Sequence, residues 1–175
     1  MPFIHKSDSG PAQFLADNIA LLPRGLTLDI AMGVGRNAVY LAKMGFSVEG
    51  VDISPQRVAD ARRRAQQAGV TISAHVADLE DGYRIKKGVY DLIICFNYLQ
   101  RPLMPQIRDG LKKGGIVVYE TYIVDQAQWG KPRNPDHLLK HNELLDLFCD
   151  FRCLRYREGV VATRRAVASI VAQKV

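Results

Sequence analysis

Short apolar strands alternate with amphipathic helices along most of this chain, and this alternation restricts its fold more than any other feature. The run Asp-Leu-Ile-Ile-Cys-Phe at residues 91–96 is almost continuously apolar, as expected for a strand that is covered on both faces. Strands separated by helices imply a parallel sheet with right-handed crossovers. We expect strands at residues 26–30, 47–51, 70–76, 91–96 and 116–122, and helices at 37–44, 54–68 and 103–111.

The alternation stops after the fifth expected strand. A helix at residues 141–148 precedes two apolar strands, 151–158 and 166–172, which a short connection can join into an antiparallel hairpin. Residues 123–139 fit neither the helical nor the strand period. Long irregular segments of this kind are often functional, so we expect a lid or binding loop there.

No repeat or long linker divides the sequence, and 175 residues suit one hydrophobic core. An apolar pattern at 11–22 predicts a helix in the N-terminal region, residues 1–25. The predicted fold is therefore a single α/β domain over residues 1–175. It is doubly wound, and its mostly parallel sheet ends in an antiparallel C-terminal hairpin.

A glycine-rich turn joins the first expected strand to the helix after it. Gly33 and Gly35 let the backbone approach a ligand that a side chain would exclude. The unpaired N–H groups at the start of the following helix suit a carboxylate or a phosphate. Asn37 can bind the ligand as well, or it can serve as the helix N-cap.

Asp52 ends the next expected strand, 19 positions after Gly33. An acid at this place is expected to bind the hydroxyls of a ribose. The spacing of Gly33, Gly35 and Ala38 also satisfies the dinucleotide fingerprint. The glycines and Asp52 together therefore predict a ligand that contains a nucleoside, and an NAD-binding domain stays an alternative.

Three features favour a ligand other than NAD. Asp29 lies on the first strand just before the turn, where a carboxylate suits an ammonium group and would repel a pyrophosphate. Asp78 follows the third strand and is placed to accept from an adenine amino group. A single domain of this length also leaves no room for the substrate domain that a dehydrogenase usually carries.

The segment Asp29 to Asn37, followed by Gly50-Val-Asp-Ile-Ser54, resembles class I methyltransferases. It is most similar to a small subgroup that includes tellurite-resistance-type enzymes. Residues 96–103 and 114–122 extend the similarity, which covers about residues 26–145. The resemblance implies a Rossmann-like fold, S-adenosyl-L-methionine as the cofactor and methyl transfer as the activity.

The resemblance also implies where the parts of the cofactor lie. The methionine part would contact Asp29, Gly33 and Gly35, and Asp52 would bind the ribose. The adenine would contact Ala77, Asp78 and Leu79, and the reactive methyl group would lie beside Phe96 and Asn97. Arg36 either pairs with the cofactor carboxylate or is a surface arginine. The expected cofactor-binding residues are Asp29, Ala31, Gly33, Gly35, Arg36, Asn37, Asp52, Ile53, Ala77, Asp78, Leu79, Phe96 and Asn97.

The acceptor side is less defined by the sequence. Tyr98 and Arg101 follow the fourth strand and His137 lies in the irregular segment, so these three are the candidate catalytic residues, with packing or structural roles as the alternative. A soft acceptor such as a thiolate or a chalcogen oxyanion needs no base, whereas a hydroxyl or an amine benefits from one. Two positions depart from the family pattern. Ala31 stands where a third glycine is common, and Gln100 stands where close relatives are expected to have histidine.

The net charge of +6 raises the question of a nucleic-acid partner. The 24 basic residues are dispersed, and the densest cluster, Arg62 to Arg64, has no aromatic neighbours. We therefore expect a small-molecule acceptor and no nucleic acid, with a non-catalytic cofactor- or RNA-binding module as the alternative. No apolar run approaches the roughly 20 residues that cross a bilayer, so we expect no membrane contact.

The N-terminal residues Met1 to Asp8 lack the apolar core of a signal peptide, which predicts a cytoplasmic protein. Cys149 and Cys153 lack a second Cys or His pair at zinc-ligand spacing. We expect them to be small buried apolar residues, and we expect no metal site. The sequence leaves the oligomeric state open.

Overall fold

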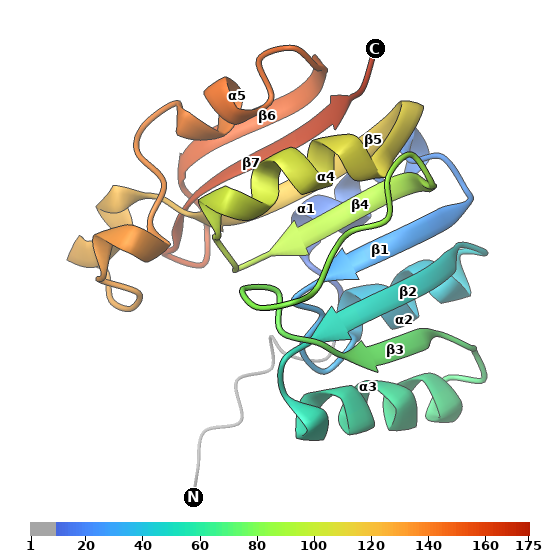
Figure 1. Ribbon diagram of the computed structural model, residues 1–175. Coiled ribbons are helices and arrows are strands. Elements are labelled where there is room, and N and C mark those ends of the chain that lie inside the picture. Colours follow the sequence, from blue (N-terminus) through green and yellow to red (C-terminus); the bar gives the residue numbers. More distant parts are fainter. Residues whose placement is uncertain (1–9) are drawn as a thin grey trace, which may run out of the picture.

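Seven strands form one sheet in the computed structural model, which describes residues 10–175 (Figure 1). The strand order is β3-β2-β1-β4-β5-β7-β6. The first five strands run parallel, and β7 and β6 are antiparallel to their neighbours. This arrangement confirms the predicted fold class. The strands are β1 (Leu26–Ile30), β2 (Ser47–Asp52), β3 (Ser73–Val76), β4 (Tyr90–Phe96), β5 (Leu111–Tyr122), β6 (Arg152–Val160) and β7 (Ala166–Gln173).

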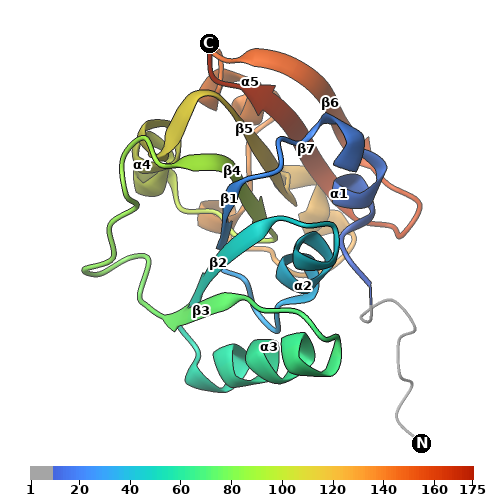
Figure 2. The ribbon, with the colours of Figure 1, turned by 90° about the vertical axis from the view of Figure 1, so that its right-hand side faces the viewer.

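Helices cover both faces of the sheet, as the edge-on view in Figure 2 shows. One apolar cluster joins the sheet to α1, α2 and α3, and a second joins it to α4 and α5. No helix in the described part of the chain is long and apolar enough to span a bilayer. The helices are α1 (Gln13–Asp17), α2 (Arg36–Lys43), α3 (Pro55–Gln67), α4 (Met104–Gly110) and α5 (Glu143–Leu147), with 3-10 turns at Ile19–Leu21, Arg101–Leu103, Val124–Gln128 and Pro135–His137.

Local signals explain how the central elements begin. The Ser54 hydroxyl accepts a hydrogen bond from the Arg57 backbone N–H, and Pro55 occupies the first turn of α3. Asp91, at the start of β4, accepts from the Leu26 backbone N–H at 2.8 Å through Oδ2. This bond ties the start of β1 to its neighbour β4 and sets their register.

Three expectations were wrong in detail. The helix expected at residues 11–22 is a short α1 and a 3-10 turn, because the Asn18 side chain donates to the Phe14 carbonyl and the helix ends there. Strand β5 continues through the glycines at 114 and 115, where its pairing with β4 has an irregularity. Cys149 and Cys153 are exposed rather than buried, since one follows α5 and the other lies on the edge strand β6.

The irregular segment at residues 123–139 is closed at its base. Ile123 and Leu139 form an isolated bridge and are buried. The Val124 N–H donates to the Leu139 carbonyl at 2.9 Å, and Gln126 Oε1 accepts from the Ala166 N–H of β7 at 2.9 Å. The base of this loop is therefore part of the folded core, while residues 128–137 are mostly exposed. Its role as a lid stays a prediction, as does the location inferred from Met1 to Asp8, which lie outside the described residues.

The order of the strands fixes where a ligand can bind. Strand β1 pairs with β2 on one side and β4 on the other, so the direction in which the chain adds strands reverses between β1 and β4. In open α/β sheets a crevice forms at such a point, beyond the carboxyl ends of the strands. The glycine-rich turn, Asp52 and the residues after Phe96 all lie at this edge.

Candidate functional site

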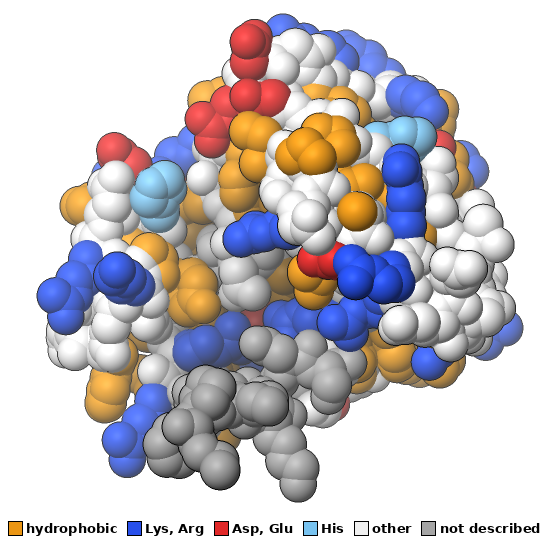
Figure 3. Space-filling view, turned by 90° about the horizontal axis from the view of Figure 1, so that it is seen from below, with side chains coloured by type: hydrophobic (Ala, Val, Ile, Leu, Met, Phe, Trp, Pro, Cys, Tyr) orange, Lys and Arg blue, Asp and Glu red, His pale blue; other side chains and the backbone are white. Residues whose placement is uncertain are grey.

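A cavity of about 470 Å³ opens at the carboxyl ends of β1, β2 and β4. A second one of about 260 Å³ shares Ala31, Asp52, Arg57 and Tyr98 with it, and we call the two together the cofactor cleft. Basic side chains gather around the middle of the face seen from below in Figure 3. The first cavity is lined by Asp29, Ala31, Met32, Gly33, Val34, Arg36, Asn37, Asp52, Arg57, Arg64, Phe96, Asn97 and Tyr98.

The turn after β1 has three residues in the left-handed region, with φ of 53° at Ala31, 58° at Gly33 and 75° at Gly35. A Cβ on Gly33 would meet no atom within 4 Å, so this position borders open space in the cleft. A Cβ on Gly35 would come within 2.7 Å of the Ala61 Cβ. Gly35 therefore lets α2 pack against α3, and it lines none of the cavities, whereas Gly33 faces the cleft.

Asp52 connects the two parts of the motif directly. Its Oδ2 accepts from the Gly33 N–H at 2.8 Å, and its Oδ1 accepts from the Ser54 N–H at 2.9 Å. Each bond fixes one carboxylate oxygen, and each oxygen keeps a further lone pair. The carboxylate is thus held rigidly at the edge of the cleft, where it can accept from a ligand hydroxyl.

Asp29 lies under the turn and is 2% exposed. Its Oδ2 has no hydrogen-bond partner among the described residues. Burial raises the pKa of Asp29 to about 8, while the Ala38 N–H and the nearby Arg36 guanidinium act in the opposite direction. A buried carboxylate with one unsatisfied oxygen is costly unless a partner arrives, and a cationic ligand in the cleft would supply one.

The smaller cavity contains most of the residues expected near the adenine. Ile53 is 63% exposed and lines it together with Asp78 and Leu79. Asp78 Oδ1 accepts from the Glu80 N–H at 2.8 Å. Ala77 lines none of the cavities, because its N–H donates to the Asp52 carbonyl and continues the β2–β3 ladder.

Two asparagines border the larger cavity for different reasons. Asn37 does not cap α2, since Gly35 holds that position, and its Oδ1 accepts from the buried Ala12 N–H at 2.8 Å. Asn97 follows β4 with a φ of 58°, and its N–H donates to the Glu120 carbonyl at 2.9 Å. Phe96 is buried beside it.

A further cavity of about 590 Å³ adjoins the cofactor cleft and shares Glu80, Asn97 and Tyr98 with it. We call it the acceptor cavity. The Tyr98 hydroxyl lies 3.5 Å from Glu80 Oε1, and burial together with this carboxylate raises the pKa of Tyr98. The cavity is lined by Glu80, Asn97, Tyr98, Leu99, Thr121, Tyr122, Lys131, Pro132, Arg133, Asn134 and His137.

The three candidate catalytic residues separate in the structure. Tyr98 and His137 both line the acceptor cavity. Arg101 lines none of these cavities, because its guanidinium donates to Glu143 at 2.9 Å and to the Leu138 carbonyl at 2.9 Å. Arg101 therefore fastens the irregular loop to α5. The structure does not bring Arg101 to the acceptor cavity, which Tyr98 and His137 both line.

Several lining residues were missed by the sequence reasoning. Arg57 and Arg64 line the larger cavity from α3, and Glu80 lines the acceptor cavity. Arg57 could have been found, since it lies in the first turn of the helix after Asp52 and so near the same edge. Nothing in the local sequence marks Arg64. Across residues 10–175, no group of three His, Cys, Asp or Glu side chains could hold a metal ion.

Comparison with known proteins gives the family of this chain. The model of the methyltransferase domain family matches residues 27–115, half of the chain. A ubiquinone biosynthesis O-methyltransferase of Sodalis glossinidius is 27% identical over 107 residues, which cover 58% of this chain and 43% of the relative. The chain spans about half the length of the curated relatives it matches.

Solved structures share the fold. TehB from Haemophilus influenzae superposes with a TM-score of 0.76 at 20% identity, covering 92% of this chain and 61% of TehB. An S-adenosylmethionine-dependent methyltransferase from Mesorhizobium loti gives a TM-score of 0.75 at 17% identity, covering 93% of this chain and 98% of that one. At such identities the likeness establishes the fold alone.

The chain belongs to the methyltransferase domain family, which confirms the class implied by the resemblance of residues 29–37 and 50–54 and, with it, S-adenosylmethionine as the cofactor. The residues present fit that cofactor. The unsatisfied Asp29 oxygen suits its ammonium group, and the open space at Gly33 leaves room for it. Asp52 is fixed where ribose hydroxyls can donate to it.

Proposed function

We propose that this chain transfers a methyl group from S-adenosylmethionine to a small-molecule acceptor. The observation that carries the proposal is the pair of carboxylates in the cofactor cleft. Asp29 has an oxygen without a partner, and Asp52 is locked by Gly33 and Ser54 at the cleft edge. Asp29 suits the ammonium group of the methionine part of this cofactor, and Asp52 suits its ribose.

We assign separate parts of the cleft to separate parts of the cofactor. Asp29 and Arg36 would bind the ammonium and carboxylate groups of the methionine part, and Asp52 would hold the ribose. Ile53 and Leu79 would cover the adenine, which Asp78 would contact. When bound, the cofactor supplies a methyl group on a sulfonium that is itself a good leaving group. The chain's own residues then need to orient the acceptor and exclude water, since proximity and alignment account for much of the rate.

The acceptor cavity supports a small acceptor over a macromolecular one. It has a volume of about 590 Å³, within the range of small-molecule sites. Tyr98 and Asn97 separate it from the cofactor cleft, so an acceptor there would lie beside the cofactor. Tyr98 would orient the acceptor by hydrogen bonding. Its hydroxyl is protonated at neutral pH, as in any tyrosine, and the raised pKa keeps it so at higher pH.

The charge of the acceptor cavity indicates the kind of acceptor. Lys131, Arg133 and His137 lie along its side on the irregular loop, and Glu80 is its one acidic lining residue. This balance favours an acceptor that carries negative charge. A thiolate or a chalcogen oxyanion meets that condition and needs no general base.

The test is methyl transfer from methyl-labelled S-adenosylmethionine to paired acceptors. Suitable pairs are 4-mercaptobenzoate with 4-mercaptobenzamide, and selenite with a neutral alcohol. We expect turnover to favour the anionic member and to fall at least fivefold in a Lys131→Gln, Arg133→Gln variant. A Lys43→Gln, Lys113→Gln variant removes the same charge elsewhere and should behave as the unaltered protein. Faster turnover of the neutral members would contradict the acceptor assignment.

Two other functions are distinguished by binding. An NAD-binding domain would bind NAD in competition with S-adenosylhomocysteine, and the buried Asp29 argues against a pyrophosphate at the turn. An RNA-associated module would bind RNA with an affinity that falls steeply as salt increases. We expect neither NAD binding nor RNA binding. A calorimetric competition would reveal NAD binding, and filter binding at two salt concentrations would reveal RNA binding.

A further inference from the structure

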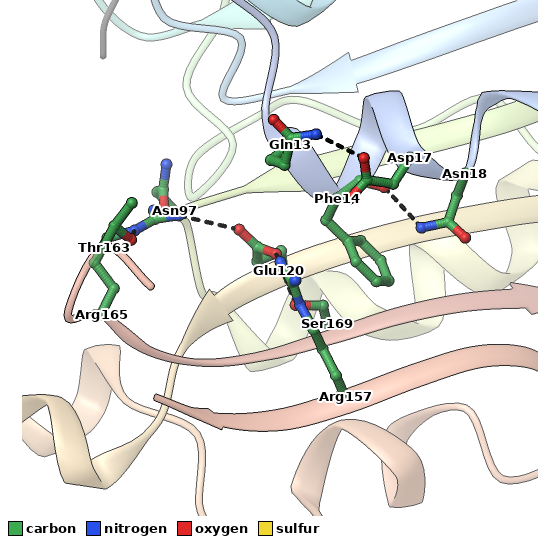
Figure 4. Close-up of polar contacts among 10 residues, drawn as sticks. All are labelled: Gln13, Phe14, Asp17, Asn18, Asn97, Glu120, Arg157, Thr163, Arg165 and Ser169. Carbon is green, nitrogen blue, oxygen red and sulfur yellow. Dashed lines mark hydrogen bonds and ion pairs between the residues drawn. The ribbon is translucent and has the colours of Figure 1, made fainter. Parts of the chain in front are cut away.

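The buried carboxylate of Glu120 is surrounded by polar groups from the C-terminal hairpin (Figure 4). Glu120 lies on β5 and is 2% exposed. Its Oε2 accepts from the Ser169 hydroxyl at 2.7 Å and from Arg157 at 3.0 Å, while its Oε1 accepts from Arg165 at 3.4 Å. Glu120, Arg157, Arg165 and Ser169 all lie outside residues 27–115, the part of the chain that the family model matches.

Arg165 reaches from this cluster into the candidate site. One of its terminal nitrogens donates to Glu120, and the other donates to Asn97 Oδ1 at 3.3 Å. The guanidinium carbon also lies 6.0 Å from the centre of the Tyr122 ring. Asn97 and Tyr122 both line the acceptor cavity, so a residue of the β6–β7 turn contacts two of its walls.

This contact determines which end of the Asn97 carboxamide faces Arg165. A guanidinium has donors only, so it must meet the carboxamide oxygen. The amide NH₂ of Asn97 is then left for the junction between the cofactor cleft and the acceptor cavity, which Asn97 lines from both sides. The backbone of Asn97 is fixed as well. Its φ is 58°, and its N–H donates to the Glu120 carbonyl.

The same cluster holds the N-terminal helix near the cofactor cleft. The Arg157 guanidinium carbon lies 4.8 Å from the centre of the Phe14 ring of α1. Both residues are labelled in Figure 4. The start of α1 is tied to the cleft by the bond from the Ala12 N–H to Asn37 Oδ1. Helix α1 therefore contacts this cluster through Arg157, and Arg165 is the member of the cluster that hydrogen-bonds to a side chain lining the cavities.

We propose that Arg165 is a positioning residue, which, anchored by Glu120, fixes Asn97 as a hydrogen-bond donor at the junction of the cofactor cleft and the acceptor cavity. The inference rests on the proposed function, because it assigns Asn97 to a site that binds S-adenosylmethionine. A purely structural role for Arg165 would be to hold the hairpin against β5. The two roles differ in whether the effect of Arg165 on ligand binding requires the Asn97 side chain.

A double-mutant cycle separates these roles. The variants are Arg165→Gln, Asn97→Gly and the combination, with glycine chosen because the φ of 58° strains other residues. The readout is the dissociation constant for S-adenosylhomocysteine from calorimetry, below the melting temperature of every variant. Arg164→Gln is the matched control, since it removes an exposed arginine from the same turn.

We expect Arg165→Gln to weaken binding about fivefold in the unaltered protein and less than twofold in the Asn97→Gly background. Arg165→Lys should recover part of the loss, because a lysine ammonium also only donates. Arg164→Gln should bind as the unaltered protein does.

Three results would overturn the inference. The first is an equal loss of affinity for S-adenosylhomocysteine from Arg165→Gln in both backgrounds, and the second is no loss of affinity in either background. The third is a loss of affinity in Arg164→Gln as large as that in Arg165→Gln. If the unaltered folded protein fails to bind S-adenosylhomocysteine at all, the proposed function fails as well, and this outcome is distinct from the other three.

Discussion

Asp29 and Glu120 are both carboxylates of strands in the same sheet, and both are 2% exposed, yet their surroundings are opposite. Asp29 has an oxygen with no partner among the described residues. Glu120 is bonded to two arginines and a serine. A buried carboxylate oxygen without a partner is costly, whereas ion pairs and hydrogen bonds offset the cost of burying a carboxylate.

The comparison shows that the two halves of the site are stabilised differently. On the cofactor side, backbone turns and local bonds such as that from the Gly33 N–H to Asp52 form the cleft, and Asp29 has an oxygen without a partner. Under the proposed function this oxygen serves a ligand at the expense of stability. On the acceptor side, side chains from distant elements hold the walls, and Glu120 serves the fold directly. Under the proposed function, the cofactor side loses folding stability because it keeps a buried group for the ligand, whereas the acceptor side does not.

The largest expected effect is an increase in stability from Asp29→Asn. The pKa of Asp29 is raised from 3.8 to about 8 in the folded chain, so between these values the folded state binds more protons than the unfolded state. The contribution of Asp29 to stability must therefore fall as pH rises from about 4 to 8. The neutral asparagine removes this cost. A rise of about four pKa units, at roughly 1.4 kcal/mol per unit, sets an upper bound of about 6 kcal/mol, so we expect several kcal/mol more unfolding free energy at pH 8. Urea unfolding at pH 5 and pH 8 measures it.

The same carboxylate makes ligand binding depend on pH. Asp29 has to lose its proton before it can pair with an ammonium group, so the affinity for S-adenosylhomocysteine should rise between pH 6 and 8, by at most about tenfold per unit. Calorimetry across this range should show the increase in the unaltered protein and its absence in Asp29→Asn. An affinity that falls with pH would contradict the assignment of Asp29 to the ammonium group.

The opposite sign is expected for Glu120→Gln. This change leaves Arg157 and Arg165 without their common carboxylate, and we expect a loss of about 2 kcal/mol of unfolding free energy. Breaking a fully buried ion pair costs more, but both arginines are partly exposed. The same urea series measures it. If Asp29→Asn and Glu120→Gln shift stability in the same direction, the contrast between the two carboxylates is wrong.

A smaller effect is expected at the irregular loop. Arg101→Gln removes the pair with Glu143 and the bond to the Leu138 carbonyl, so we expect a loss of about 1 kcal/mol. Trypsin should then cleave within residues 128–137 several times faster. Arg108→Gln, which breaks a pair with Asp150 away from this loop, should leave the cleavage rate unchanged. Equal protection in both variants would show that Arg101 does not hold the loop.

The smallest effect is expected at the cofactor turn. Ala31 has a φ of 53°, which glycine adopts without strain, so Ala31→Gly should raise the unfolding free energy by about 0.5 kcal/mol. Ala38→Gly is the control, because it lies inside α2 and should destabilise the chain by about 1 kcal/mol. Differential scanning calorimetry distinguishes a rise from a fall in melting temperature.

Local patterns explain why the cofactor half was predictable from the sequence. The glycine turn and Asp52 are recognised by spacing, and parallel strands bring their carboxyl ends to one edge whatever the rest of the chain does. The bond from Gly33 to Asp52 is the direct result. The same reasoning found Asn97 and Tyr98, because they follow β4 at that edge.

Long-range side-chain contacts explain why the other half was not predictable. Arg165 lies 68 positions from Asn97, and their contact depends on how the C-terminal hairpin docks on β5. Arg101 follows β4 as Tyr98 does, yet its side chain turns to Glu143, which lies 42 positions further on. Neither contact leaves a periodic or spaced signal in the sequence, since each is decided by packing.

The most direct test of the cofactor site is calorimetric titration of the folded protein with S-adenosylhomocysteine, beside Asp52→Ala and Asp60→Ala. We predict micromolar binding by the unaltered protein and by Asp60→Ala, which removes a partly exposed carboxylate that pairs with Arg63 on α3. Asp52→Ala should bind at least about 30-fold more weakly, as expected when a charge-assisted hydrogen bond worth about 2 kcal/mol is lost. No binding by the unaltered protein, or equal binding by Asp52→Ala, would contradict the proposed site.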